Sequence, residues 1–230
     1  MLEIKNLKIK LTEDIDNKSI IENANFGMNA GDIVLLEGVN GSGKSSLLNA
    51  IFKNPKYSII DGEVLLDEKN IIGIDTHEMV RMGLYLALQH APEIAGVSTI
   101  KFLYRAYENV NKDEKKKSIV ELKNFLEEKC DEYDLDKTLL SRDTNVGFSG
   151  GEKKQAELLH ILALAPSYVF MDEPDSGVDK EAVNKVYKVI NDLAKSGMSI
   201  LITSHNANVQ NLNITKRYTI KDKIICSQEK

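Results

Sequence analysis

One glycine-rich segment, residues 38–45, constrains the fold of this chain more than any other feature. It reads Gly38-Val39-Asn40-Gly41-Ser42-Gly43-Lys44-Ser45 and so fits the pattern of Gly, four residues, and Gly-Lys-Ser. An apolar run, Ile33 to Leu36, precedes it, and a helix-like stretch, Ser46 to Phe52, follows it. Backbone N–H groups of such a loop can surround an anionic oxygen cluster, and the helix start adds the positive end of its dipole. The segment therefore predicts a phosphate-binding loop between a strand and a helix.

Two side chains of this loop carry the chemistry of a nucleotide site. Lys44 would place a point charge beside the terminal phosphates, and the Ser45 hydroxyl would reach a magnesium ion. The strand and helix on either side disfavour the alternative, a glycine-rich turn with an incidental lysine. We expect nucleotide contacts from Gly38, Asn40, Gly41, Ser42, Gly43, Lys44, Ser45 and Ser46.

The whole-chain composition narrows the class of protein. The 230 residues are 42% hydrophobic and 28% charged, which is typical of one large α/β domain or a core with a modest subdomain. The longest apolar run, Leu158 to Ala165 interrupted by His160, is too short to cross a bilayer. A net charge of −5 argues against a dedicated nucleic-acid binder. We expect a cytoplasmic protein that neither inserts into a membrane nor binds nucleic acid.

Hydrophobic periodicity predicts an α/β chain. Leu2 to Leu11 and Ile20 to Met28 read as antiparallel strands. From about Pro92 to Asn145 apolar residues recur at three- and four-residue spacing, which predicts a helical block inserted between two core strands. Further strands are predicted at Gly62–Leu66, Leu84–Leu88, Tyr168–Met171 and Ser199–Thr203, helices at Thr76–Met82, Gly150–Leu164 and Lys180–Ser196, and a hairpin at Tyr218–Cys226. Such alternation implies a mostly parallel sheet with ligands at the carboxyl ends of its strands.

A second informative segment, Phe170 to Pro174, puts two carboxylates directly after a buried apolar strand. Asp172 would hold magnesium, directly or through water, beside the phosphates bound by Lys44. Glu173 would point toward the attacking water and act as a general base, a role worth about 10² to 10⁴-fold in rate. Acidic turns after strands are common, and the phosphate loop upstream is what favours the catalytic interpretation.

A third segment, Phe148-Ser149-Gly150-Gly151-Glu152, opens a helix and offers a second anion site through its backbone N–H groups and the Ser149 hydroxyl. With the phosphate loop, Gln89, the Asp172-Glu173 pair and His205, it resembles the motifs of the ATP-binding cassette (ABC) ATPases, in that family's order and over nearly the whole chain. The resemblance implies a RecA-like P-loop ATPase core, a small antiparallel β subdomain and an inserted helical subdomain. Within a single domain of residues 1–230, about 1–91 and 146–230 would form the catalytic core and about 92–145 the helical subdomain.

The same resemblance assigns roles residue by residue. The Ser149-Gly150-Gly151-Glu152 motif would close on the γ-phosphate bound to a second subunit, so a competent site needs two chains. Gln89 would sense the metal and the attacking water, and His205 would contact the γ-phosphate and steady Glu173 or the water. Asp179, which is also a candidate helix N-cap, would lie in the loop that crosses the dimer interface. The structural alternatives are a polar residue at a strand end for Gln89 and a loop histidine for His205. The resemblance implies metal contacts from Ser45, Gln89 and Asp172.

Two longer strings resemble one branch of this family. Residues 145–154, Asn-Val-Gly-Phe-Ser-Gly-Gly-Glu-Lys-Lys, and residues 89–98, Gln-His-Ala-Pro-Glu-Ile-Ala-Gly-Val-Ser, look like the SufC branch, the ATPase of Suf-type iron–sulfur cluster assembly. The transporter consensus reads Leu-Ser-Gly-Gly-Gln in the first string, with glutamine where this chain has Glu152. Transporter ATPases also usually carry an early aromatic residue that stacks on adenine. None occurs between Met1 and Asn25 here, and aliphatic residues near Ile15 to Ile20 would take its place.

The SufC resemblance implies an ATPase that uses ATP and Mg²⁺ and handles neither iron nor sulfide itself. It would bind a SufB/SufD-type scaffold protein through the groove near Glu93 to Tyr104, and ATP-dependent homodimerisation would change the scaffold's conformation. One alternative is the ATPase subunit of an ABC membrane transporter. Another is an ATP-gated dimerisation module, for example on DNA. Only about a hundred residues separate Lys44 from Ser149, which disfavours the long coiled coil of the genome-maintenance branch.

Two lysines, Lys153 and Lys154, follow the third motif by one helical turn. With no partner bound, Lys154 is the preferred candidate to pair with Glu173 and hold this base out of position, which would give low basal ATPase activity. The dimer interface of the family consists mostly of bound nucleotide. We therefore expect a monomer without ATP and a transient dimer with it, trapped best by Glu173→Gln.

Overall fold

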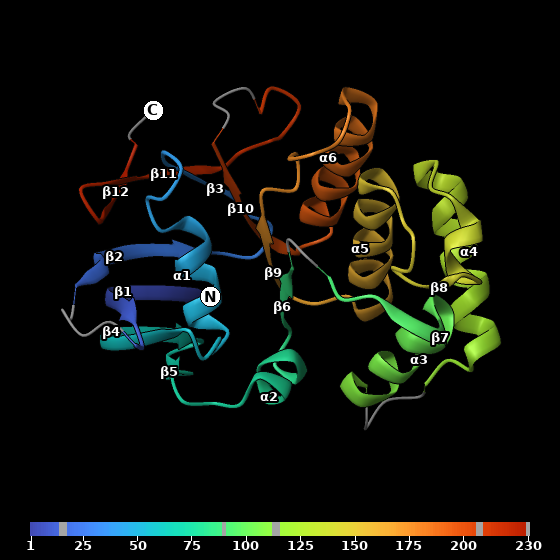
Figure 1. Cartoon of the computed structure of the whole chain (residues 1–230), viewed down its shortest axis with the longest axis horizontal. Coiled ribbons are helices and arrows are strands. Elements are labelled where there is room, and N and C mark those ends of the chain that lie inside the picture. Colours follow the sequence, from blue (N-terminus) through green and yellow to red (C-terminus); the bar gives the residue numbers. More distant parts are fainter. Residues whose placement is uncertain (14–17, 89–90, 112–115, 206–208, 229–230) are drawn as a thin grey trace.

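The computed structural model describes residues 1–13, 18–88, 91–111, 116–205 and 209–228. Its strands are β1 (Leu2–Leu11), β2 (Ser19–Met28), β3 (Ile33–Glu37), β4 (Tyr57–Leu66), β5 (Lys69–Asn70), β6 (Leu84–Ala87), β7 (Ile94–Ser98), β8 (Asp143–Thr144), β9 (Tyr168–Asp172), β10 (Ser199–Ser204), β11 (Lys216–Lys221) and β12 (Ile224–Ser227). Its helices are α1 (Lys44–Ile51), α2 (Thr76–Arg81), α3 (Thr99–Val110), α4 (Ile119–Tyr133), η1 (Lys137–Leu140), α5 (Gly150–Leu164) and α6 (Lys180–Lys195). The large sheet has the order β5-β4-β1-β2-β12-β11-β3-β10-β9-β6 (Figure 1).

The central strands β11, β3, β10, β9 and β6 run parallel to one another, while β11 pairs antiparallel with β12 on its other side. Their apolar side chains alternate between two cores: Ile33 and Leu35 pack with α5 and α6, while Val34 and Leu36 pack with α1. Because both faces are covered, these strands are continuous apolar runs in the sequence. The buried parallel strands predicted from that pattern are therefore confirmed.

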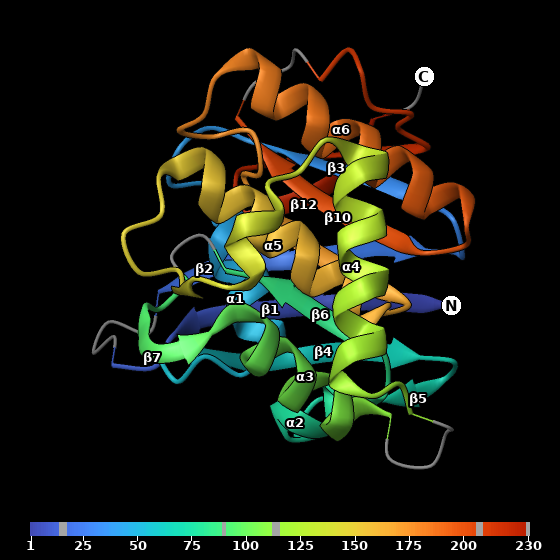
Figure 2. The ribbon, with the colours of Figure 1, turned by 90° about the vertical axis from the view of Figure 1, so that its right-hand side faces the viewer.

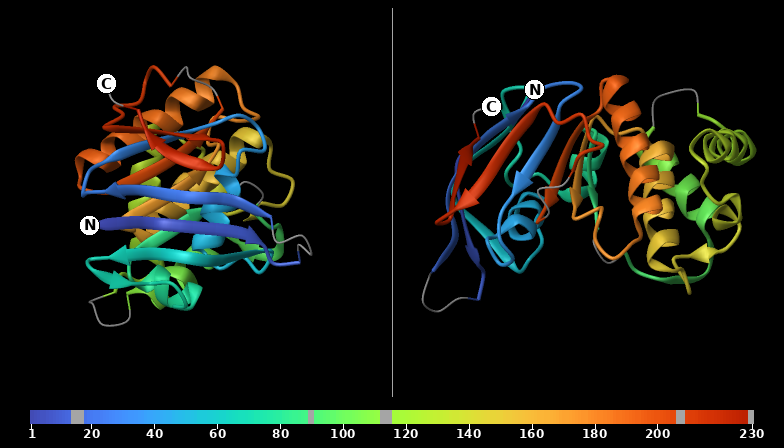
Figure 3. Two further views of the ribbon diagram at one scale, coloured as in Figure 1. Left: turned by 90° about the vertical axis from the view of Figure 1, so that its left-hand side faces the viewer. Right: turned by 90° about the horizontal axis from the view of Figure 1, so that it is seen from above.

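The first strands form the antiparallel part of the sheet. β1 pairs antiparallel with both β2 and β4, and β5 extends β4 at the edge. Seen from above, these strands curve around α1, which lies between them and the central strands (Figure 3). The antiparallel pair predicted from the alternation at the start of the chain is confirmed.

The segment between β6 and α5 carries β7, α3, α4, η1 and β8. Figure 2 shows α4 in front of α5, on the side of the molecule away from the N-terminal strands. The sequence pattern predicted helices throughout this block, whereas β7 and β8 pair at its two ends. Side-chain hydrogen bonds explain the difference, because Thr144 Oγ1 donates to Val97 O at 2.9 Å and Asn145 Nδ2 donates to Pro92 O at 3.0 Å. These contacts bring the two ends of the block together.

Helix ends follow local capping rules. Asp179 caps α6 by accepting a hydrogen bond from Ala182 N at 2.9 Å, which confirms the predicted N-cap. α5 ends at Leu164, and the next residue, Ala165, has a left-handed φ of 45° and precedes Pro166. Gly197, with a φ of 103°, follows the end of α6 as predicted for a helix C-terminus. Among the described residues no helix is long and apolar enough to span a membrane.

Candidate active site

The carboxyl ends of four parallel strands lie along one edge of the sheet. The register pairs Ser204 with Glu37, Thr203 with Asp172 and Met171 with Ala87. The glycine-rich loop after β3, Glu173 after β9 and His205 after β10 therefore start side by side, as expected for parallel strands. Gln89 follows β6 but lies outside the described residues, so its predicted role stays a prediction.

The glycine-rich loop holds its lysine in place. Lys44 is 5% exposed, and its ammonium donates to the carbonyl oxygens of Gly38 at 2.7 Å and Val39 at 3.3 Å. The N–H of Ser42 donates back to Val39 O at 3.1 Å, which closes the loop as a turn. The neutral carbonyls are weaker partners for an ammonium than phosphate oxygens, so the same position suits a bound polyphosphate.

Two glycines of this loop, Gly38 and Gly43, lie where a Cβ would crowd a neighbouring side chain. A Cβ on Gly38 would lie 2.5 Å from Ser42 Oγ, and a Cβ on Gly43, at a φ of 105°, would lie 2.9 Å from Ile21 Cδ1. Ser42 Oγ is enclosed without a hydrogen-bond partner among the described residues. An unpaired enclosed hydroxyl beside a glycine-lined turn fits the donor set of an anion site. The remaining predicted contacts occupy the loop and the first turn of α1: Asn40 and Gly41 are exposed, and Ser45 and Ser46 are half-buried.

A cavity of about 860 Å³ opens beside this loop. It extends from the start of β2, at Ser19 and Ile20, past His205 to the turn between β11 and β12. No Phe, Tyr or Trp is present among the described residues that line it. Ile15, the first of the aliphatic residues predicted to replace an adenine-stacking aromatic, lies outside the described part of the chain.

Thr203, which the sequence analysis did not single out, forms hydrogen bonds with both Asp172 and Glu173. Thr203 is fully buried on β10, and its hydroxyl donates to Asp172 Oδ1 at 2.6 Å. The Thr203 hydroxyl oxygen also accepts the backbone N–H of Glu173 at 3.0 Å. Asp172 itself is 7% exposed. One hydroxyl thus fixes the carboxylate that ends β9 and the peptide group that follows it. No local signal marks Thr203, because its partners are on another strand.

Glu173 has a left-handed backbone, with a φ of 49°, which costs a residue other than glycine of order 1 kcal/mol. Its carboxylate Oε1 lies 3.3 Å from His205 Nδ1. The pairing predicted for Lys154 differs: its ammonium contacts the Glu173 carbonyl oxygen at 3.4 Å instead of the carboxylate. The backbone conformation explains this, since it directs the carbonyl toward α5 and the side chain toward the end of β10.

The third motif begins α5 with a capping box. Ser149 Oγ accepts the N–H of Glu152 at 3.2 Å, and Glu152 Oε2 accepts the N–H of Ser149 at 2.7 Å. A Cβ on Gly150 would lie 3.0 Å from Gly177 O, so this motif packs closely on the loop before α6. None of residues 149–152, nor Asp179, lines the cavity beside the glycine-rich loop. The structure therefore does not bring the third motif to the phosphate site of its own chain.

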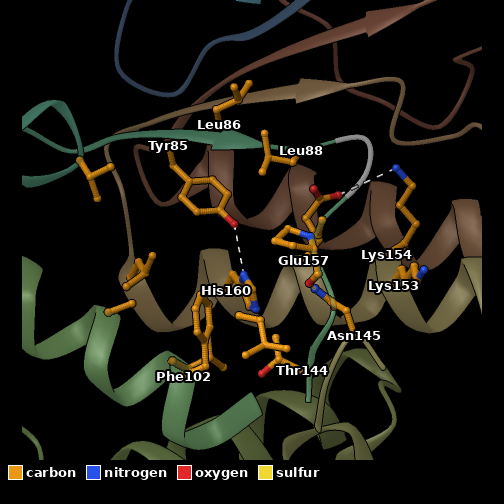
Figure 4. Close-up of a pocket in the computed structure, with 17 residues that line it drawn as sticks. Tyr85, Leu86, Leu88, Phe102, Thr144, Asn145, Lys153, Lys154, Glu157 and His160 are labelled. Atoms are coloured by element: carbon orange, nitrogen blue, oxygen red, sulfur yellow. Dashed lines mark hydrogen bonds and ion pairs between the residues drawn. The ribbon is translucent and has the colours of Figure 1, made fainter. Parts of the chain in front are cut away.

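An apolar pocket of about 320 Å³ lies beside the residues that follow β6 (Figure 4). Its lining includes Leu88, which is 47% exposed. Polar groups from β6 and α5 also face it: Tyr85 Oη lies 3.4 Å from His160 Nδ1, and Glu157 pairs with Lys154 at 3.9 Å. Burial lowers the pKa of His160 to about 4 and raises the pKa of Glu157 to about 7, against the opposing effect of Lys154. His160 Nε2 is enclosed without a partner among the described residues.

Comparison with protein families gives a match over most of the chain. A family model described as ABC transporter matches residues 21–176. A probable ATP-dependent transporter of Cyanophora paradoxa, ycf16, is 38% identical over 207 residues, which cover 89% of this chain and 78% of that protein. A probable ABC transporter ATP-binding protein of Streptococcus pyogenes serotype M3 is 36% identical over 205 residues, with the same two coverages of 89% and 78%.

Solved structures show the same fold. The dimeric structure of MJ0796, a bacterial ABC transporter cassette, superimposes with a TM-score of 0.82 at 20% identity, over 100% of this chain and 98% of that one. A post-hydrolysis dimer of the same cassette, bound to ADP and Pi, superimposes with a TM-score of 0.80 at 19% identity, over 100% of this chain and 98% of that one. The predicted architecture, an α/β P-loop core with a small antiparallel β part, is thereby confirmed.

Proposed function

Since the chain belongs to the family of ABC transporter ATPase domains and is an ABC ATPase, we propose that it powers a Suf-type iron–sulfur cluster assembly machine, in which it binds and drives a SufB/SufD-type scaffold. The observation that carries this proposal is the meeting of the two strings that resemble the SufC branch, residues 89–98 and 145–154. They are joined by the bond from Asn145 to Pro92 and by an ion pair between Lys153 and Glu93 at 3.3 Å. Both strings also line the apolar pocket of Figure 4.

This pocket has the features of a protein docking site. Its lining is mostly apolar and includes the exposed Leu88, and the buried centre of an interface is likewise more apolar than its rim. We assign about 1–91 and 146–230 to the catalytic core and about 92–145 to the helical subdomain, so the pocket would lie where the two parts meet. A scaffold seated there would contact the segment that contains Gln89.

In ATP hydrolysis, different residues of this chain would bind the phosphates, bind the metal ion and accept the proton. Lys44 and the loop amides would hold the polyphosphate, and Ser45 and Asp172 supply the oxygen ligands that Mg²⁺ prefers. The ion would neutralise charge that develops on the phosphate oxygens. Glu173 would accept the proton of the attacking water, while His205, now 3.3 Å from its carboxylate, would hold it in position. Thr203 fixes the backbone from which that carboxylate extends.

A second copy of the chain would complete the site. The third motif does not reach the cavity beside its own glycine-rich loop, and the solved structure with the same fold is described as dimeric. We propose ATP-dependent homodimerisation in which the Ser149 motif of each subunit closes on the nucleotide of the other. Glu173→Gln should accumulate this dimer in the presence of ATP, because binding is retained and the base is lost.

The alternative, an ATPase subunit of a membrane transporter, is favoured by the names of the relatives, which are called probable transporters. An affinity purification of the tagged chain from a detergent-solubilised lysate of its native cells, without oxygen, separates the two. A co-purifying protein rich in β-structure, with iron or a brown colour, supports cluster assembly, whereas a polytopic membrane protein overturns it in favour of transport.

Two matched variants test whether the partner protein binds at this pocket. Leu88→Glu puts a charge into the apolar lining, and Val120→Glu makes the same change at another exposed apolar residue, on α4 and outside the pocket. Leu88→Glu should lower partner recovery by about 30-fold or more, as expected for a central interface residue, while Val120→Glu should not. Equal recovery with both variants would place the partner elsewhere.

A further inference from the structure

Position 152 has an acidic residue at the end of an anion-binding motif. The backbone N–H groups at the start of α5 and the positive end of its dipole favour an anion. Glu152 brings a carboxylate to the first turn of this helix, where the transporter consensus has a neutral glutamine. An approaching polyphosphate would therefore meet both the favourable helix end and a like charge.

Arg142 is bound to this carboxylate. Its Nη1 donates to Glu152 Oε1, while the other carboxylate oxygen accepts the N–H of Ser149 at 2.7 Å. Both oxygens of Glu152 thus have a donor. The Ser149 N–H first, and Arg142 second, hold the pKa of Glu152 below its ordinary value. The carboxyl is therefore ionised at neutral pH, and Arg142 balances its charge.

Arg142 is itself fixed from two other directions. Its guanidinium lies over the ring of Phe148 at 4.4 Å from the centroid. Its carbonyl oxygen accepts from both the N–H and the hydroxyl of Thr99, at 2.9 and 3.2 Å. A residue held in three ways beside the motif contributes more than a mobile surface charge would.

We propose that Arg142 is a positioning residue that neutralises Glu152 and so allows the Ser149 motif of one subunit to close on the nucleotide held by the other. A glutamine at position 152 would not need this arginine, because its amide carries no charge to balance. This inference rests on the ATP-dependent dimer of the proposed function.

The test measures dimer formation against ATP concentration in the Glu173→Gln background, by analytical ultracentrifugation. Arg142→Ala should raise the ATP concentration for half-maximal dimer by about tenfold, the effect of one uncompensated charge near a polyphosphate at a protein surface. Adding Glu152→Gln to Arg142→Ala should restore dimerisation to within about twofold of the background. The tenfold defect should also shrink as salt is raised, because exposed charges are screened.

Two controls separate charge from folding. Arg105→Ala removes another arginine–carboxylate pair, with Glu108 on α3, and should leave dimerisation unchanged. If Arg142→Ala does not fold, Arg142→Gln removes the charge while its stem can still cover the Phe148 ring. A defect that Glu152→Gln does not rescue, or no defect at all, overturns the inference. Absence of any dimer in the Glu173→Gln background overturns the proposed function, and the inference falls with it.

Discussion

Removing the hydroxyl of Thr203 tests how Asp172 and Glu173 are positioned at the carboxyl ends of the strands. Thr203→Val keeps the shape of the side chain and removes the oxygen that bonds both Asp172 Oδ1 and Glu173 N. A hydrogen bond to a charged group contributes about 1.5–3 kcal/mol, and a buried amide left without an acceptor adds about 1 kcal/mol. The substitution should therefore lower the free energy of unfolding by about 3 kcal/mol.

For a chain of this length each kcal/mol corresponds to roughly 2–4 °C, so the melting temperature should fall by roughly 6–12 °C. Turnover at saturating ATP should fall by about 10 to 100-fold, because the Glu173 peptide loses its anchor and a small displacement of a catalytic group is costly. Both quantities are measured on the isolated protein, by thermal melting and by steady-state phosphate release.

The controls isolate the carboxylate bond. Thr203→Ser retains the hydroxyl and should keep most of the stability and turnover. Thr144→Val removes another buried threonine hydroxyl, which donates to the neutral carbonyl of Val97, and should cost about 1 kcal/mol without loss of turnover. The reasoning is refuted if Thr203→Val and Thr144→Val lose equal stability and turnover.

Three further predictions concern other parts of the site. Lys154→Ala removes one of two donors to the Glu173 carbonyl, the other being the N–H of Ser176 at 3.1 Å, and should raise the turnover of the isolated protein by about fivefold. Unchanged turnover would show that Lys154 does not hold Glu173 out of position. The pKa of Glu157 is raised from 4.5 to about 7 in the folded protein. As the pH rises, this carboxyl ionises first in the unfolded chain, so the free energy of unfolding should fall between pH 4.5 and pH 7, by at most about 3 kcal/mol. Glu157→Gln should remove that slope, and thermal melts of both proteins at pH 5 and pH 8 would detect it as a difference that grows with pH. Gly43→Ala should abolish ATP binding through its clash with Ile21, whereas Gly73→Ala, at a similarly left-handed φ but with open space, should only lower the melting temperature; equal ATP affinity of the two variants would contradict this.

Features set by neighbours in sequence were predictable. The strand, glycine-rich loop and helix at residues 33–52 follow from periodicity and a spaced motif, and Asp179 is a cap because its side chain reaches a backbone N–H three residues on. These features depend on contacts within a few residues, which a sequence displays directly.

Features set by register between distant segments were not predictable. Thr203 meets Asp172 because β10 pairs with β9 in one particular register, and a shift by one residue would turn the hydroxyl to the other face. His160 interrupts an apolar run and matches no motif, yet the packing of α5 against β6 places it beside Tyr85 in a pocket. Local sequence patterns cannot specify such pairs, because the partners are far apart in the sequence and only the packing of their elements brings them together.

Lys154 contacts both the apolar pocket and Glu173. Its side chain, 13% exposed, lines the apolar pocket and pairs with Glu157 there, while its ammonium also contacts the carbonyl oxygen of Glu173. A partner that fills the pocket and contacts Glu157 would change the electrostatic surroundings of this ammonium. Because the Glu173 backbone has a strained left-handed φ, a change at the Lys154 contact would bias its conformation, while the bonds to Thr203 and Ser176 hold the rest of the peptide group. A partner docked at the pocket would thus act on Glu173, the proposed general base, through a single side chain, without any contact to the nucleotide.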